Sequence, residues 1–138
     1  MGLDAGIMIK KNYRKLPKWF RTVVAFPHNW EKDCDSYDTI DICYWRNEWD
    51  LARIIGRDVL KVELDVDTES YPLTYEQVKQ IYEKTKFYLA HPKEWNEIGH
   101  WEYDECVERM KQHKDNLFWL LLLMKFKPRI KVAFYASF

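Results

Sequence analysis

The sequence has few of the residues on which many small enzymes and metalloproteins depend. It contains four glycines and three cysteines, Cys34, Cys43 and Cys106, without a CxxC pair. This spacing argues against a disulfide framework and against a zinc cluster. The sequence also lacks a paired-histidine motif, a glycine-rich phosphate loop and a nucleophile elbow. We therefore expect a protein without enzymatic activity and without a cofactor.

Excess charge and a long apolar segment are absent as well. Lys and Arg total 22 and balance the 22 Asp and Glu residues, so bulk charge indicates neither a nucleic acid nor a membrane partner. The apolar run at 117–124 is far shorter than the ~20 residues that span a bilayer. The first residues do not show the basic and apolar regions of a secretory signal. We expect one cytoplasmic domain covering 1–138, long enough to bury a core.

Aromatic residues, in contrast, are abundant. They make up 17% of the chain and include seven tryptophans, more than a core of this size requires. Some of these rings are therefore expected to line a pocket or an interface. An aromatic-rich core is the alternative, because large rings bury much area per residue.

The hydrophobic pattern predicts an α+β fold with a small mixed or antiparallel sheet. Apolar residues alternate with polar ones at 1–9, near 59–67 and at 130–138, which indicates strands. Gly6, inside the first strand, suggests a bulge or a close backbone approach. Apolar residues at three-to-four spacing predict three helices, at about 43–56, 75–90 and 103–126. Thr74 and Gln77 have the spacing of a capping box before the second of these helices.

The predicted helix at 43–56 combines three large aromatic residues with two arginines, which makes it the main candidate for ligand binding. Its aromatic side chains can stack on bases, and its arginines can bind phosphate through paired hydrogen bonds. The residues concerned are Tyr44, Trp45, Arg46, Trp49 and Arg53. The same aromatic residues could instead form only the core-facing stripe of the helix, and the sequence leaves both interpretations open.

Basic residues flank the two terminal strands. The first group is Lys10, Lys11 and Arg14, and the second is Lys127, Arg129 and Lys131. If the terminal strands pair antiparallel, the two groups converge in one basic patch. Parallel pairing would scatter them, and lysines beside strands can also serve only to prevent edge-to-edge association.

The segment 28–38 contains several titratable residues that could in principle bind a metal ion. The candidates are His28, Asp33, Cys34, Asp35 and Asp38. Their spacing matches no established metal-binding pattern, so a polar loop is favoured and no metal site is predicted. A hydrolase using His28, Asp33, Asp35, His91 or His100 is the least favoured reading, because scattered histidines show no base-and-orienter pattern. His113, in the stripe of the last helix, is expected to be a core histidine.

The last predicted helix is apolar on nearly all sides between 117 and 123. A helix of this kind lies at the centre of a core or has a second partner. For a chain this small the second partner is expected to be another subunit, so we predict a homo-oligomer formed through this helix.

Several short motifs carry a family resemblance. The opening Met1-Gly2-Leu3-Asp4, the Tyr44-Trp45-Arg46 segment, the Thr74-capped helix and the aromatic last strand resemble an uncharacterised family of small phage and bacterial proteins. Members typically open Met-Gly-Leu-Asp-Met-Tyr-Leu and carry a Tyr-Trp-Arg-Lys segment, from which this chain departs at Ala5, Gly6 and Asn47. The family supplies no established activity. The resemblance implies a phage or mobile-element protein that acts in the bacterial cytosol.

Together these features favour a small binding protein that sequesters a nucleotide-type ligand, such as a cyclic-nucleotide signal of bacterial antiviral defence. The predicted ligand-binding residues are Tyr44, Trp45, Arg46, Trp49, Arg53, Lys10, Lys11, Arg14, Arg129 and Lys131. The alternative is an interaction protein that inhibits a host protein through Trp19, Trp95, Trp101 and the basic segment, since Trp and Arg dominate protein interfaces.

Overall fold

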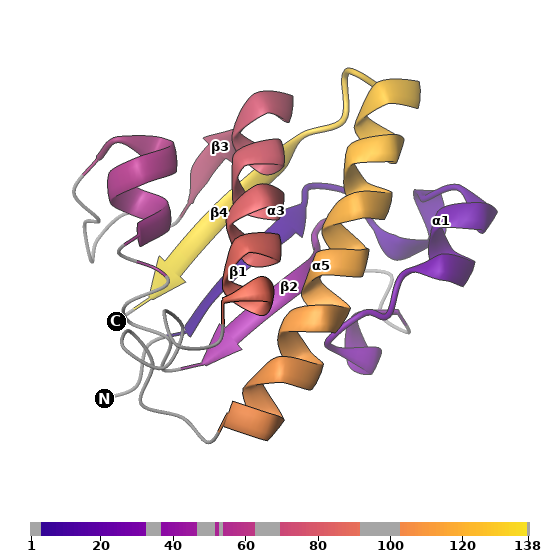
Figure 1. Cartoon of the computed structure of the whole chain (residues 1–138). Coiled ribbons are helices and arrows are strands. Elements are labelled where there is room, and N and C mark those ends of the chain that lie inside the picture. Colours follow the sequence, from indigo (N-terminus) through magenta and orange to yellow (C-terminus); the bar gives the residue numbers. More distant parts are fainter. Residues whose placement is uncertain are drawn as a thin grey trace.

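The fold is α+β and is built on a four-stranded antiparallel sheet, which confirms the predicted fold class (Figure 1). The computed structural model describes residues 4–32, 37–46, 52, 54–62, 70–91 and 103–137, with the side chains at 29, 46 and 103–106 excepted. The strands are β1 (Asp4–Ile9), β2 (Ile40–Arg46), β3 (Tyr71–Leu73) and β4 (Val132–Ser137). Their order in the sheet is β2-β1-β4-β3.

Two long helices lie against one face of this sheet (Figure 1). They are α3 (Tyr75–Ala90) and α5 (Tyr103–Phe126), and both match the predicted helices. The shorter elements are α1 (Lys18–Val23), which packs beside α5, two 3-10 turns, η1 (Tyr13–Lys15) and η2 (Asn29–Lys32), and a π-type helix, η3 (Ile55–Leu60).

The start of α3 is fixed by a reciprocal cap. The backbone N–H of Gln77 donates to Thr74 Oγ1 at 3.2 Å, and the backbone N–H of Thr74 donates to Gln77 Oε1 at 2.8 Å. Two amide groups that would otherwise lack helical partners are thereby satisfied. The capping box seen in the sequence is confirmed.

The core lies between the sheet and the long helices. Ile7 and Ile9 of β1 and Leu117 and Leu120 of α5 are completely buried. Alternation along β1 sends every second side chain toward the helices, and three-to-four spacing along α5 sends its leucines toward the sheet. Burial of each such side chain contributes about 1.5–3 kcal/mol.

The apolar part of α5 is covered to a large extent within one chain. Leu117, Leu120 and Leu123 are fully buried, whereas Phe118 is 47% exposed. Contacts with α3, α1 and β2 account for this burial. Oligomerisation through α5 stays a prediction. Among the described residues, none of the helices combines the length and apolar content needed to cross a bilayer.

The predicted helix at 43–56 is wrong at its beginning, because residues 43–46 belong to β2. Cys43 and Trp45 are buried and Tyr44 is partly exposed, which is the period-two pattern of a strand. Helical structure in this region comes later, at Ala52, Ile54 and η3. Residues 47–51 and 53 lie outside the described part of the chain.

The predicted strand near 59–67 is also wrong in the part that the structure describes. Val59 and Leu60 are helical, and Lys61 follows in a left-handed conformation with φ of 56°. The backbone N–H of Val62 donates to the carbonyl of Gly56 at 2.9 Å and closes the helix end. Residues 63–69 lie outside the described residues, and among the described strands β3 is the one that follows β2 along the chain.

A bulge in the β1–β2 pair decides which way Asp41 points. Ile7 pairs with Cys43, but Met8 pairs with Asp41, so Ile42 is the extra residue. Without the bulge Asp41 would share the helix-covered face of Ile7. With it, Asp41 shares the opposite face of the sheet with Met8.

Candidate functional site

The first candidate site forms where β1 ends and β4 begins. The two terminal strands pair antiparallel, with Ile9 opposite Val132. The backbone N–H of Lys10 continues the ladder by donating to the carbonyl of Lys131 at 2.9 Å. The end of the first strand is therefore beside the start of the last, which is the arrangement that brings the two basic groups together.

A cleft of about 710 Å³ lies at this junction. Its basic lining residues are Lys10, Lys11, Lys15, Lys127, Arg129 and Lys131, and we call it the basic cleft. Asp38 is the acidic residue among the described lining residues. Five of the six terminal basic residues named from the sequence therefore line this one cleft. The sixth, Arg14 of η1, is not among the described lining residues.

An aromatic patch, Trp30 and Tyr37, is linked to the basic cleft through the backbone of Tyr37, and neither ring is among the described residues that line the cleft. The Asn12 side-chain amide, which also lines the cleft, donates to the carbonyl of Tyr37 at 2.7 Å. Asp38, the next residue, lines the cleft as well. The rings of Trp30 and Tyr37 lie 5.1 Å apart and are 55% and 41% exposed. Exposed rings beside cationic side chains are the two components of a nucleotide-binding surface.

The aromatic residues chosen from the sequence lie elsewhere. Trp45 is only 1% exposed and packs edge-on against the His113 ring at 5.3 Å, so it is a core residue and cannot stack on a ligand. Tyr44 lies on the face of β2 away from the helices, where its hydroxyl donates to Asp4 Oδ1 at 2.6 Å. The predicted residues Trp49 and Arg53, and the side chain of Arg46, lie outside the described part of the chain.

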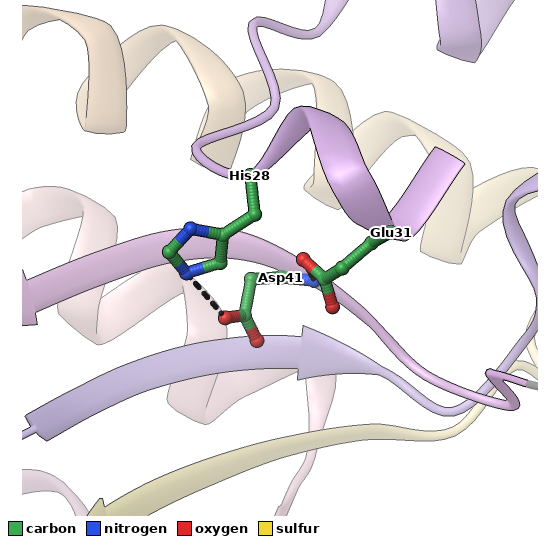
Figure 2. A group of neighbouring side chains, drawn as sticks. All are labelled: His28, Glu31 and Asp41. Atoms are coloured by element: carbon green, nitrogen blue, oxygen red, sulfur yellow. Dashed lines mark hydrogen bonds and ion pairs between the residues drawn. The ribbon is translucent and has the colours of Figure 1, made fainter. Parts of the chain in front are cut away.

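The second candidate site is a polar triad, His28, Glu31 and Asp41 (Figure 2). Figure 2 shows the His28 imidazole and the Glu31 carboxyl pointing toward Asp41 from the segment that contains η2, while Asp41 projects from β2. His28 Nε2 lies 3.1 Å from Asp41 Oδ2. One nitrogen or oxygen atom from each of the three side chains lies within 4.8 Å of the others.

Neighbouring groups hold the triad in place. The Tyr135 hydroxyl of β4 donates to Asp41 Oδ2 at 2.8 Å, and the backbone N–H of Asp41 donates to Glu31 Oε1 at 3.3 Å. Tyr135 can reach across β1 because Gly6 has no side chain. A Cβ at this position would lie 2.7 Å from the Tyr135 hydroxyl oxygen. The close backbone approach expected at Gly6 is confirmed.

The triad brings two carboxyl groups out of water side by side. Glu31 is 5% exposed and Asp41 is 9% exposed. Burial, with the Asp41 charge as the second cause, raises the pKa of Glu31 to about 7. Burial also raises the pKa of Asp41, although hydrogen bonds from Tyr135 and His28 oppose that change. Buried carboxylates need a compensating positive charge or a proton.

Sequence reasoning found only part of this triad. His28 was among the possible metal ligands, but Glu31 and Asp41 were not. Asp38 lines the basic cleft instead, and residues 33–35 lie outside the described residues. The three-residue spacing of His28 and Glu31 was an available signal. The direction of Asp41 was not, because it depends on the bulge at Ile42.

His113 is a core residue of α5. It is 2% exposed, and its Nε2 accepts the backbone N–H of Tyr44 at 3.4 Å. Burial, assisted by the charge of Arg109, lowers the pKa of His113 to about 3. The imidazole is therefore neutral near pH 7, as befits a core histidine that joins α5 to β2.

Comparison of the chain with protein-family models, with curated proteins and with solved structures found no match. The resemblance to small phage and bacterial proteins stays a prediction.

Proposed function

We propose that this chain is a small binding protein that holds a phosphate-bearing, nucleotide-type ligand in the basic cleft. The observation that carries the proposal is the concentration of charge. Six cationic side chains and the carboxylate of Asp38 line one cleft in a chain whose formal net charge is zero. A cleft of about 710 Å³ has the size of ordinary small-molecule sites.

Phosphate is the chemistry that suits this lining best. Lysine ammonium groups and the Arg129 guanidinium donate charge-assisted hydrogen bonds to phosphate oxygens. The cations come from both terminal segments, so a ligand with more than one phosphate can contact Lys10 and Lys131 together. Mutual repulsion among the empty cations also favours an anion over a neutral ligand.

The aromatic patch supports a nucleotide rather than a simple polyanion. Trp30 and Tyr37 expose ring surface, and the Tyr37 backbone is bonded to the cleft residue Asn12. Base stacking contributes about 1–3 kcal/mol per base. Phosphates in the cleft and a base on these rings would use both surfaces. In this role the protein sequesters its ligand unchanged, and a cyclic-nucleotide signal of antiviral defence in the bacterial cytosol is the ligand class we favour.

Titration calorimetry and thermal shift with cyclic dinucleotides, cyclic trinucleotides, ADP-ribose, tripolyphosphate and an unphosphorylated nucleoside test this proposal. We expect at least one nucleotide to bind more tightly than tripolyphosphate, and the nucleoside to bind weakly. The absence of binding by every phosphate compound would refute the proposal. Tripolyphosphate binding as tightly as every nucleotide would refute its nucleotide part.

Variants separate the two surfaces. Replacing Arg129 and Lys131 by Ala should weaken binding of every phosphate compound at least about tenfold, since each charge-assisted hydrogen bond contributes about 1.5–3 kcal/mol. Lys79→Ala, on the exposed surface of α3, is the matched control and should have no effect. Trp30→Ala should weaken nucleotide binding and leave tripolyphosphate binding unchanged. Ligand recovered intact after denaturation distinguishes sequestration from hydrolysis.

A second candidate function is inhibition of a host protein. Trp19 and Phe126 lie 6.3 Å apart on the surface and are 37% and 71% exposed, which is an aromatic pair suited to a protein interface. Recovery of one stoichiometric host protein by the wild-type chain, and its loss in Trp19→Ala, would favour this function over ligand binding.

A further inference from the structure

We propose that His28, Glu31 and Asp41 bind a divalent transition-metal ion of the zinc type. None of these three side chains is among the described residues that line the basic cleft. Phosphate binding in the basic cleft and metal binding by the triad therefore use different side chains, and either can fail without the other. The Trp30 ring stacks on the His28 imidazole at 5.5 Å, so base stacking and metal binding have this contact in common.

The separations between the side chains suit such an ion. With metal–ligand bonds of ~2.1 Å, neighbouring ligand atoms lie ~3.4 Å apart in a tetrahedral site and ~3.0 Å apart in an octahedral one. His28 Nε2 and Asp41 Oδ2 are already 3.1 Å apart. All three ligand atoms lie within 4.8 Å of one another, so the longest separation has to shorten by only ~1.4 Å to match a tetrahedral edge.

Charge gives the second argument. Glu31 and Asp41 are 5% and 9% exposed, and they face one imidazole. Two ionised carboxylates at this depth lack a matching charge, because His28 supplies at most one positive charge. A divalent cation balances both, and it would replace the direct contact between His28 Nε2 and Asp41 Oδ2.

The donor set selects the kind of ion. One imidazole nitrogen and two carboxylates suit Zn²⁺, Co²⁺ and Mn²⁺. Ca²⁺ and Mg²⁺ prefer sites made of oxygen alone. A soft ion such as Cu(I) would need thiolate. Among the cysteines whose side chains the structure describes there is Cys43, which is directed to the other side of β2, where its thiol donates to the carbonyl of His113.

The surroundings have the form of a supported metal site. The Tyr135 hydroxyl donates to Asp41 Oδ2, and the Asp41 backbone N–H donates to Glu31 Oε1. Such outer hydrogen bonds orient ligating carboxylates, and their loss weakens metal binding about 10–100-fold. The ion would join η2, which carries Glu31, to the edge strand β2, which carries Asp41.

Titration calorimetry of the chelator-treated full chain with ZnCl₂ and with MnCl₂ tests the site, and the visible absorption of added Co²⁺ reports its geometry. We expect one equivalent of Zn²⁺ to bind and to raise the melting temperature. His28→Ala and Asp41→Asn should abolish both effects, and Tyr135→Phe should weaken binding about 10–100-fold.

His91→Ala is the matched control, because His91 is an exposed imidazole at the end of α3. It should leave the stoichiometry at one. The proposal fails if wild type binds none of these ions, or if His28→Ala binds Zn²⁺ as tightly as wild type does. His28 has 21% side-chain exposure, so its replacement tests the site even if Asp41→Asn does not fold. Circular dichroism in chelator establishes that each variant is folded.

Discussion

The hydroxyl of Tyr135 reaches Asp41 Oδ2 across the strand that lies between them, at a distance of 2.8 Å. Tyr135 belongs to β4 and Asp41 to β2, whereas β1 occupies the position between these strands. The contact passes over Gly6, which pairs with Tyr135 and has no side chain to block it. A single glycine therefore permits a bond between two strands that do not touch through their backbones.

Gly6→Ala should destabilise the fold. Its Cβ would lie 2.5 Å from the carbonyl oxygen of Cys43 and 2.7 Å from the Tyr135 hydroxyl, so backbone as well as side chain must move. We expect a loss of about 1–3 kcal/mol, measured by urea unfolding. Tyr135→Phe combined with Gly6→Ala should restore little of this, since the Cys43 contact remains. A change below about 0.5 kcal/mol would contradict the close approach.

Glu31→Gln should become stabilising as pH rises. In metal-free buffer the folded-state pKa of Glu31 is about 7, above its ordinary value of 4.5. The folded state thus binds the proton more tightly, and the resulting stability is fully present below pH 4.5 and lost as pH rises through 7. The shift corresponds to about 3 kcal/mol.

The side-chain amide introduced by Glu31→Gln would keep an acceptor for the Asp41 N–H without a charge. Chemical denaturation of wild type and Glu31→Gln at pH 5 and pH 8, with chelator present, measures the difference. We expect the variant to gain relative to wild type at pH 8 only. Equal differences at the two pH values would show that Glu31 does not titrate in this range.

His113 should make the protein sensitive to acid. The pKa of His113 falls from 6.5 to about 3 on folding. Between these two pH values the imidazole binds a proton in the unfolded state but not in the folded state. Stability from this group is present above pH 6.5 and falls as the pH drops toward 3, by about 2 kcal/mol between pH 6.5 and pH 5. His113→Gln offers an uncharged acceptor to the Tyr44 N–H and should flatten this slope. If the stability of His113→Gln falls with pH as steeply as that of wild type, His113 is not the cause of the acid sensitivity.

Thr74→Ala should weaken the start of α3 by about 1 kcal/mol, because the Gln77 N–H loses its side-chain acceptor. Thr74→Ser retains the hydroxyl and serves as the control, with a change of a few tenths of a kcal/mol at most. Denaturant midpoints of the three proteins measure the effect. Equal losses in both variants would instead indicate that the threonine methyl group matters.

Local signals made the long helices and the terminal strands predictable. The cap at Thr74 and the three-to-four spacing along 103–126 each act within a few residues, so the sequence contains them directly. The convergence of Lys10 with Lys131 followed from one assumption, antiparallel pairing of the terminal strands, which the fold contains. The basic cleft was in this sense within reach of sequence reasoning.

The aromatic segment was misread because its spacing fits both periods. Trp45 and Trp49 are one helical turn apart, but Cys43 and Trp45 also share one face of a strand. The bulge at Ile42 interrupts the alternation just before them, with Ile42 and Cys43 both fully buried. A period-two pattern broken in this way is difficult to recognise in a sequence.

The polar triad was out of reach for a different reason. His28 and Glu31 meet Asp41 only after η2 has packed against β2, and the bulge decides the face on which Asp41 appears. Neither the packing of η2 against β2 nor the position of the bulge can be predicted from the local pattern of residues. Long-range packing, and not propensity, creates this site.

The pairing of Asp4 with Ser137 has a consequence for synthesis on the ribosome. β1 leaves the exit tunnel before β2 and can pair with it first, but its other side stays unpaired until β4 has left the tunnel as well. The interior of the sheet, the β1–β4 junction at the basic cleft and the Tyr135 support of Asp41 are all completed together, when β4 pairs with β1. A nascent chain stalled before β4 would therefore hold neither candidate ligand.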